Sequence, residues 1–144
     1  MPALKAKCAN LQITLILQMP TNKKVLPELL YPNLPYKIVG LCFDVHNEVG
    51  SYAREKQYAG AVEKRLKNEN ISHKREYHIN DSGNIVDFLI EEKVLLELKT
   101  VRALARLHFN QIQNYLQQSE IKLGLLINFS DKFLRPKRIL RSNK

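Results

Sequence analysis

The stretch 85-IVDFLIEEKVLLELKT-100 decides the fold of this chain. Two runs rich in leucine and β-branched residues flank a charged turn, a pattern typical of a buried β-hairpin. One carboxylate, Asp87, lies inside the first run, and Glu97 and Lys99 lie inside the second. Because charged side chains are seldom buried without a partner, these three charges need a physical reason.

The register of the hairpin decides whether the charges meet. If residues 91–93 form the loop, Ile90 pairs with Val94. Counting outward from that pair places Asp87 opposite Glu97 on one face, roughly 5 Å apart at Cβ. A loop shorter by one residue would place them on opposite faces. Opposed like charges repel unless a cation joins them, so the first register predicts a cation-binding site.

Two carboxylates and an amine on one half-buried strand face are typical of metal-dependent hydrolysis. Asp87 and Glu97 can hold Mg²⁺, which prefers oxygen ligands, with Mn²⁺ as a substitute. The cation would polarise a phosphodiester oxygen and lower the pKa of a bound water, while Lys99 would position that water or stabilise the developing charge. No organic cofactor is expected. The alternative is a solvated strand face on which Glu97 and Lys99 only meet water.

Composition and charge are those of a basic globular domain. The 144 residues suffice for one domain with a real core, and 44% of them are hydrophobic. Lys and Arg number 23 against 14 acids, and this net charge of +9 favours a polyanionic partner such as nucleic acid, with DNA expected. Cys8 and Cys42 lack metal-ligand spacing, and no apolar run reaches about 18 residues. A cytoplasmic protein with reduced thiols and no membrane span is therefore expected.

Basic residues form two clusters that are candidates for nucleic-acid contacts. The candidates are Lys64, Arg65, Lys67, Lys132, Arg135, Lys137, Arg138 and Arg141. A non-catalytic nucleic-acid-binding module would use these clusters without a metal. An interaction subunit that docks a partner through a Pro-rich segment is a further hypothesis, and a simply solvated basic surface is the plain alternative.

The remainder of the chain predicts helices and strands around this hairpin. Prolines crowd residues 20–35, which favours an extended arm. Apolar residues at helical spacing predict helices at 36–50, 53–70 and 105–118, the first ending at Gly50. Strands are predicted at 73–79, 121–129 and 136–142, besides the two of the hairpin. The order α-α-β-β-β-α-β-β predicts a single-domain α/β sandwich, with a central mixed sheet flanked by helices.

The spacing of Asp87, nine intervening residues and then Glu97-x-Lys99 resembles the active-site signature of the PD-(D/E)XK nuclease superfamily. Further stretches resemble the GxxExxY proteins, a small branch of that superfamily: IVGLCFDVHNEVG, EKQY, LLELKTV, QIQNYL, LGLLINF and KRIL. The resemblance covers about residues 26–140. It implies a restriction-endonuclease-like domain at 26–144 with a Pro-rich entry arm at 26–35, and an N-terminal extension at 1–25.

This resemblance also implies roles for individual residues in a nuclease. Asp87 and Glu97 would be the metal ligands and Lys99 the catalytic lysine. Gln111 and Tyr115 resemble the Gln-x-x-x-Tyr motif of exonuclease-like members, and their spacing places both on one helical face.

The second predicted helix carries a third candidate ligand and a departure from the branch. Glu55 lies on the apolar stripe of that helix, where an acid needs a reason, and is a candidate metal ligand with Glu48 as its rival. Tyr52 occupies the position of the glycine that opens the GxxExxY element. A changed entry into the second helix is therefore expected.

Overall fold

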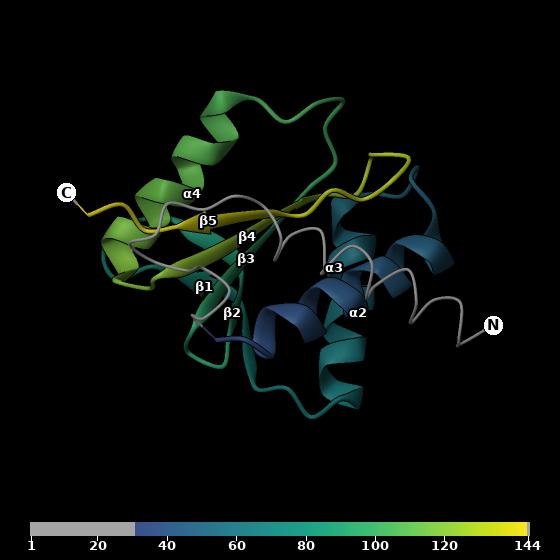
Figure 1. Ribbon diagram of the computed structural model, residues 1–144, viewed down its shortest axis with the longest axis horizontal. Coiled ribbons are helices and arrows are strands. Elements are labelled where there is room, and N and C mark those ends of the chain that lie inside the picture. The colour runs from purple at the N-terminus through teal and green to yellow at the C-terminus, as the bar shows by residue number, and fades with distance from the viewer. Residues whose placement is uncertain (1–30, 144) are drawn as a thin grey trace.

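The computed structural model describes residues 31–143, and the predicted extension at 1–25 and the arm up to residue 30 lie outside this range. Its elements follow in the predicted order (Figure 1). They are α2 (Leu34–Val49), α3 (Glu55–Asn68), β1 (His73–His78), β2 (Ile85–Ile90), β3 (Val94–Lys99), α4 (Arg106–Ser119), β4 (Leu123–Asn128) and β5 (Lys137–Leu140).

One mixed sheet with the strand order β1-β2-β3-β4-β5 forms the centre of the molecule. All neighbouring strands are antiparallel except β3 and β4, which are parallel. A parallel pair needs a crossover, and α4 provides it. The helices α2 and α3 lie on one face of the sheet and α4 lies on the other (Figure 1). This α/β sandwich confirms the predicted fold class. Within residues 31–143, none of the helices combines the length and apolar character of a membrane span.

The two faces of β3 build two separate cores. Leu96 and Leu98 pack into the cluster formed with α2 and α3, whereas Leu95 packs with Ile112 and Leu116 of α4. This alternation is the period of two expected for a strand that is buried on both faces. Glu97 and Lys99 are two and four residues after Leu95, so their side chains point to the same face of the sheet, the one that α4 covers.

The first described helix begins earlier than predicted. Residues up to 35 were expected to be extended, but α2 starts at Leu34 with Pro35 in its first turn. Proline is tolerated there because the first turn of a helix needs no N–H donor from it. The end of the helix agrees with the prediction, since Gly50 follows it with a φ of 86° that glycine adopts without strain.

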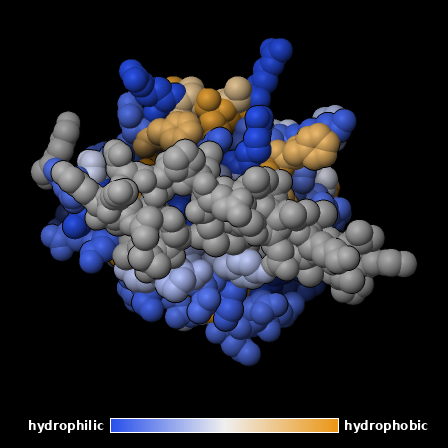
Figure 2. All heavy atoms as spheres, in the orientation of Figure 1, coloured by the Kyte–Doolittle hydropathy of each residue, from blue (hydrophilic) through white to orange (hydrophobic). Residues whose placement is uncertain are grey.

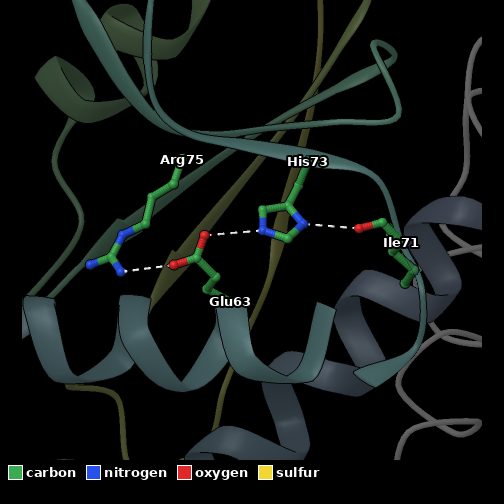
Figure 3. Close-up of polar contacts among 4 residues, drawn as sticks. All are labelled: Glu63, Ile71, His73 and Arg75. Carbon is green, nitrogen blue, oxygen red and sulfur yellow. Dashed lines mark hydrogen bonds and ion pairs between the residues drawn. The ribbon is translucent and has the colours of Figure 1, made fainter. Parts of the chain in front are cut away.

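A polar clamp fastens α3 to the edge strand β1 (Figure 3). The carboxylate of Glu63 accepts a hydrogen bond of 3.1 Å from Arg75 and lies 3.1 Å from Nε2 of His73. The other ring nitrogen of His73 lies 2.9 Å from the carbonyl oxygen of Ile71. Although burial raises the pKa of Glu63, the hydrogen bonds from Arg75 and His73 lower it overall. The clamp therefore favours an ionised Glu63.

Candidate active site

The hairpin has the register that brings the charges together. Ile90 pairs with Val94, and residues 91–93 form the loop, as predicted for the first register. The N–H of Lys93 donates to the carbonyl of Ile90 at 3.0 Å, and Glu91 and Glu92 both adopt positive φ. The pairing runs outward to Phe88 and Leu96. One further step places Asp87 opposite Glu97.

The regular pairing of β2 is interrupted at Asp87, both with β1 and with β3. On the β3 side the ladder has ended at Phe88, and on the β1 side it skips Glu76, the residue in register with Asp87. Glu76 has a φ of 51°, a left-handed conformation that is costly for a residue with a side chain. Since opposed carboxylates repel, this local break keeps the exposed Glu76 from pairing with Asp87.

Carboxylates take over hydrogen bonds that the backbone would otherwise make between β2 and β3. The N–H of Asp87 donates to Oε1 of Glu97 at 3.1 Å. The N–H of Leu98 donates to Oδ2 of Asp87 at 2.7 Å. Each acid is therefore held by the opposite strand, and the two side chains are fixed beside one another before any ligand is present.

The site holds two carboxylates, Asp87 and Glu97, against one ammonium, Lys99. The side chain of Glu97 is only 7% exposed. Its burial and the neighbouring charge of Asp87 raise the pKa of Glu97 to about 8, against the opposing effect of Lys99. The Nζ atom of Lys99 lies 3.5 Å from Oε2 of Glu97 and is the cation of this ion pair. Two acids facing one amine favour a further cation or a proton.

The predicted helical pair Gln111 and Tyr115 faces the same carboxylates. Tyr115 is buried in the α4 core, and Nε2 of Gln111 donates to its hydroxyl at 2.8 Å. Burial and the charges of Glu97 and Asp87 raise the pKa of the Tyr115 hydroxyl, so the ring end lies within electrostatic reach of both acids. Within the described residues, Oε1 of Gln111 is buried and has no hydrogen-bond partner. This acceptor is available to a ligand.

Glu55 lies at the margin of the site. It is the first residue of α3 and is exposed. Partial burial and the charge of Asp87 raise the pKa of Glu55, while Lys99 lowers it, which shows that the three charges interact. Among residues 31–143, however, no three His, Cys, Asp or Glu side chains come close enough to hold a metal ion together. Its rival Glu48 is instead in an ion pair with Arg65.

Asn128 is a site residue that the sequence analysis missed. It ends β4, beside Lys99 in the parallel register, and is 1% exposed. Its Oδ1 accepts from the N–H of Val101 at 3.0 Å, and its Nδ2 donates to the carbonyl of Val101 at 2.8 Å. This amide therefore fixes the chain that follows Lys99. The available signal was an isolated amide at the end of an apolar strand.

The entry into α3 forms without the glycine that the GxxExxY element would have. Tyr52 is not among the described residues with positive φ, so its backbone does not require glycine. The hydroxyl of Tyr58 donates to the carbonyl of Gly50, and the Tyr58 ring stacks on Phe129 with centroids 4.4 Å apart. The buried tyrosine thus closes the turn between α2 and α3.

The basic candidates do not form one patch. Arg65 is paired with Glu48 and lies 3.8 Å from Asp44, whereas Lys64 and Lys67 are exposed. In the C-terminal cluster, Lys132 and Arg135 are exposed in the loop after β4. Lys137 and Arg138 are consecutive in β5 and point to opposite faces of the sheet, and Arg141 follows the strand. The predicted nucleic-acid contacts are therefore spread over several surfaces.

Comparisons with known proteins identify the family of this chain. The family model of the PD-(D/E)XK nuclease superfamily matches residues 32–141. No curated protein matches the chain. Among solved structures, the crystal structure of SSO0001 is similar with a TM-score of 0.44 and 18% identity, covering 94% of this chain and 76% of that one. Because this match spans residues 32–141, more than half of the chain, the chain belongs to the PD-(D/E)XK nuclease superfamily.

Proposed function

We propose that this protein is a divalent-metal-dependent nuclease that hydrolyses phosphodiester bonds of DNA at Asp87, Glu97 and Lys99. The observation that carries the proposal is the pair of opposed carboxylates, each hydrogen-bonded to the other strand, with Lys99 alongside. Such an arrangement costs stability as a purely structural element, because it holds like charges together in a partly buried place. Superfamily membership supports nuclease chemistry for this arrangement.

The donor atoms fit Mg²⁺ or Mn²⁺. Asp87 and Glu97 offer carboxylate oxygens, and burial together with the charge of Asp87 raises the pKa of Glu97 despite the nearby Lys99. Mg²⁺ commonly uses one or two carboxylates and keeps several waters, so a third protein carboxylate is not required. Glu55 is proposed to act through a water rather than as a direct ligand. When bound, a divalent cation polarises the scissile phosphate and lowers the pKa of a coordinated water.

The protein side chains have separate tasks in this proposal. Lys99 positions the attacking water or stabilises the charge that develops on the phosphate, because its ammonium stands beside the carboxylates. The buried Oε1 of Gln111, which has no hydrogen-bond partner among the described residues, accepts a hydrogen bond from a water at the site, and Tyr115 orients Gln111. Preorganised groups of this kind need no rearrangement during the reaction, which is why they accelerate it.

The branch of the superfamily, the bounds of the domain and the location in the cell are proposed from the sequence. We place the chain in the GxxExxY branch, on the stretches around Glu55, Tyr58 and the site strand. The nuclease domain is assigned to residues 26–144, with residues 1–25 as an extension. A cytoplasmic location is proposed because Cys8 and Cys42 lack disulfide or metal spacing, and Cys42 is free and buried.

The test is cleavage of labelled single- and double-stranded DNA by the purified full chain, with Mg²⁺, with Mn²⁺ and with EDTA. Metal-dependent cleavage that is lost in Asp87→Asn supports the proposal. Cleavage that survives Asp87→Asn would contradict it, since another site or a contaminant would then be responsible. DNA binding without cleavage under any metal would favour the alternative, a non-catalytic binding module that uses the basic clusters.

A further inference from the structure

Three large side chains with apolar surfaces are highly exposed to solvent. Among the residues that the structure describes, Tyr52, Phe133 and Leu107 are the most exposed large apolar side chains, with relative exposures of 101%, 73% and 66%. Scattered exposed apolar residues are ordinary on protein surfaces. The segments that carry Tyr52 and Phe133 are joined by the 2.8 Å contact between Nε2 of His46 and the carbonyl oxygen of Asp131, whereas Leu107 lies in the first turn of α4.

Tyr52 is held near Lys99 by a chain of contacts. It lies in the turn that the hydroxyl of Tyr58 closes by donating to the carbonyl of Gly50. The Tyr58 ring stacks on Phe129, and the N–H of Phe129 donates to the carbonyl of Lys99 at 2.8 Å. Because each link is a direct contact, the turn that carries Tyr52 is connected to the end of β3 at Lys99.

Phe133 and Leu107 approach this end of the sheet from two other segments. Phe133 lies in the loop that follows β4, and β4 is the parallel neighbour of β3, so this loop leaves the sheet at the same end as the chain after Lys99. Leu107 lies in the first turn of α4, one turn before Gln111 and on the same helical face. Figure 2 shows hydrophobic side chains in orange beside hydrophilic ones in blue over the N-terminal end of α4 and over the β4–β5 loop.

Exposed basic side chains lie close in sequence to Phe133 and Leu107. The Nζ atom of Lys132 lies 5.5 Å from the centroid of the Phe133 ring. Arg102, Arg106 and Arg135 are exposed on the same segments. An aromatic ring can stack on a base of a nucleic-acid strand while a neighbouring cation contacts a phosphate of the same strand. A protein-docking surface would instead be a contiguous apolar patch.

We propose that Tyr52 and Phe133, flanked by Leu107, form a platform on which unpaired bases of single-stranded DNA stack, with Lys132 contacting the phosphates. This inference rests on the proposed nuclease function and specifies the form of its substrate. A duplex hides the faces of its bases within the stack, so exposed rings can engage only unpaired bases. The site would thus act on single strands or on unpaired ends.

The test measures binding and cleavage in the same samples. Fluorescence anisotropy in EDTA gives the affinity of the full chain for a labelled single strand and for the corresponding duplex. Cleavage is then followed after addition of Mn²⁺. The variants are Tyr52→Ala and Phe133→Ala, with Tyr36→Ala as the matched control. Tyr36 is a 40% exposed tyrosine near the opposite end of α2, roughly 20 Å from Tyr52 along the helix.

Loss of one stacked base predicts that each platform variant weakens single-strand binding by roughly 5- to 100-fold. Duplex binding should change by less than about twofold, and Tyr36→Ala should match the wild type in both. Equal binding of single strand and duplex by the wild type, or platform variants that bind the single strand like Tyr36→Ala, would overturn the inference. If the wild type cleaves DNA in that case, the platform alone is wrong. If no DNA is cleaved with metal, the proposed nuclease function fails, whatever the binding data show.

Discussion

Asp87 and Glu97 face each other across β2 and β3, and the backbone N–H of Asp87 donates to the carboxylate of Glu97 at 3.1 Å. In return, Asp87 accepts from the N–H of Leu98, next to Glu97 in β3. The backbone of the hairpin therefore holds the two acids beside one another. The proposed binding of a divalent cation depends on this arrangement of the two carboxylates.

The first prediction concerns pH and stability. Burial and the charge of Asp87 raise the pKa of Glu97 from 4.5 to about 8. Between these values the folded protein holds a proton that the unfolded chain releases, so the metal-free free energy of unfolding falls as pH rises and levels off above the upper pKa. The loss should be on the order of a few kcal/mol. Thermal unfolding across this range, without and with Mg²⁺, measures it.

Two controls define that result. Glu97→Gln keeps the size of the side chain and removes its titration, so its unfolding should be much less dependent on pH. Saturating Mg²⁺ should flatten the decline in the wild type, because the cation stabilises the ionised carboxylate. An unchanged slope in Glu97→Gln would show that another group is responsible.

The second prediction separates two glutamines of α4. Gln111→Leu should reduce turnover by about 100-fold, because the acceptor offered to the site is lost. Its stability should change little, because removal of a buried oxygen without a partner offsets loss of the hydrogen bond to Tyr115. Gln113→Leu is the matched control, because Gln113 donates to the carbonyl of Leu140 and accepts from the N–H of Ser142. Gln113→Leu should lose stability and keep turnover, and the reverse pattern would refute the assigned roles.

The third prediction concerns the amide that positions the end of β3. Asn128→Ala leaves the N–H and carbonyl of Val101 without their partner, which should cost about 2 kcal/mol of stability. Turnover should fall as well, because the chain after Lys99 is no longer fixed. Asn110→Ala on the exposed side of α4 should do neither. Calorimetry and cleavage rates on both variants decide the matter, and normal turnover in Asn128→Ala would exclude a positioning role.

The fourth prediction concerns the clamp between α3 and β1. Glu63→Gln should destabilise the protein by about 1 to 2 kcal/mol at neutral pH, because two charge-assisted contacts are weakened. The lowered pKa of Glu63 means that its contribution is present above the ordinary value of 4.5 and is lost as pH falls through the lower, folded value. Glu69→Gln at the exposed end of the same helix serves as the comparison. Denaturant titrations at neutral and acid pH should show the two variants converging at acid pH, and a constant difference would count against the clamp.

The hairpin and its site were predictable because they depend on local rules. The alternation of side chains and the length of the loop at 91–93 fix which residues oppose each other, so Asp87 could be placed opposite Glu97 by counting. The four-residue spacing of Gln111 and Tyr115 likewise fixes a shared helical face. The mixed sheet followed from the order of the elements, since a helix between two strands allows them to be parallel.

Other features depend on contacts between segments that are distant in sequence, so they could not be predicted by counting residues along one element. The pairing of Arg65 with Glu48 joins two helices, and the sequence does not show that these charges meet. The left-handed Glu76 is a response to the partner strand rather than a local preference. The start of α2 at Leu34 differs from the prediction because proline is compatible both with an extended segment and with the first turn of a helix.

The most direct measurement of the central claim is calorimetric titration of Mn²⁺ into the wild type, Asp87→Asn and Lys99→Ala, with DNA cleavage followed on the same preparations. The account predicts that the wild type binds the cation and cleaves, and that Asp87→Asn loses both. Lys99→Ala should still bind the cation while its cleavage falls by at least about 100-fold, because the lysine acts on the reaction and not on the metal. Wild-type cation binding or wild-type cleavage by Asp87→Asn would contradict the account.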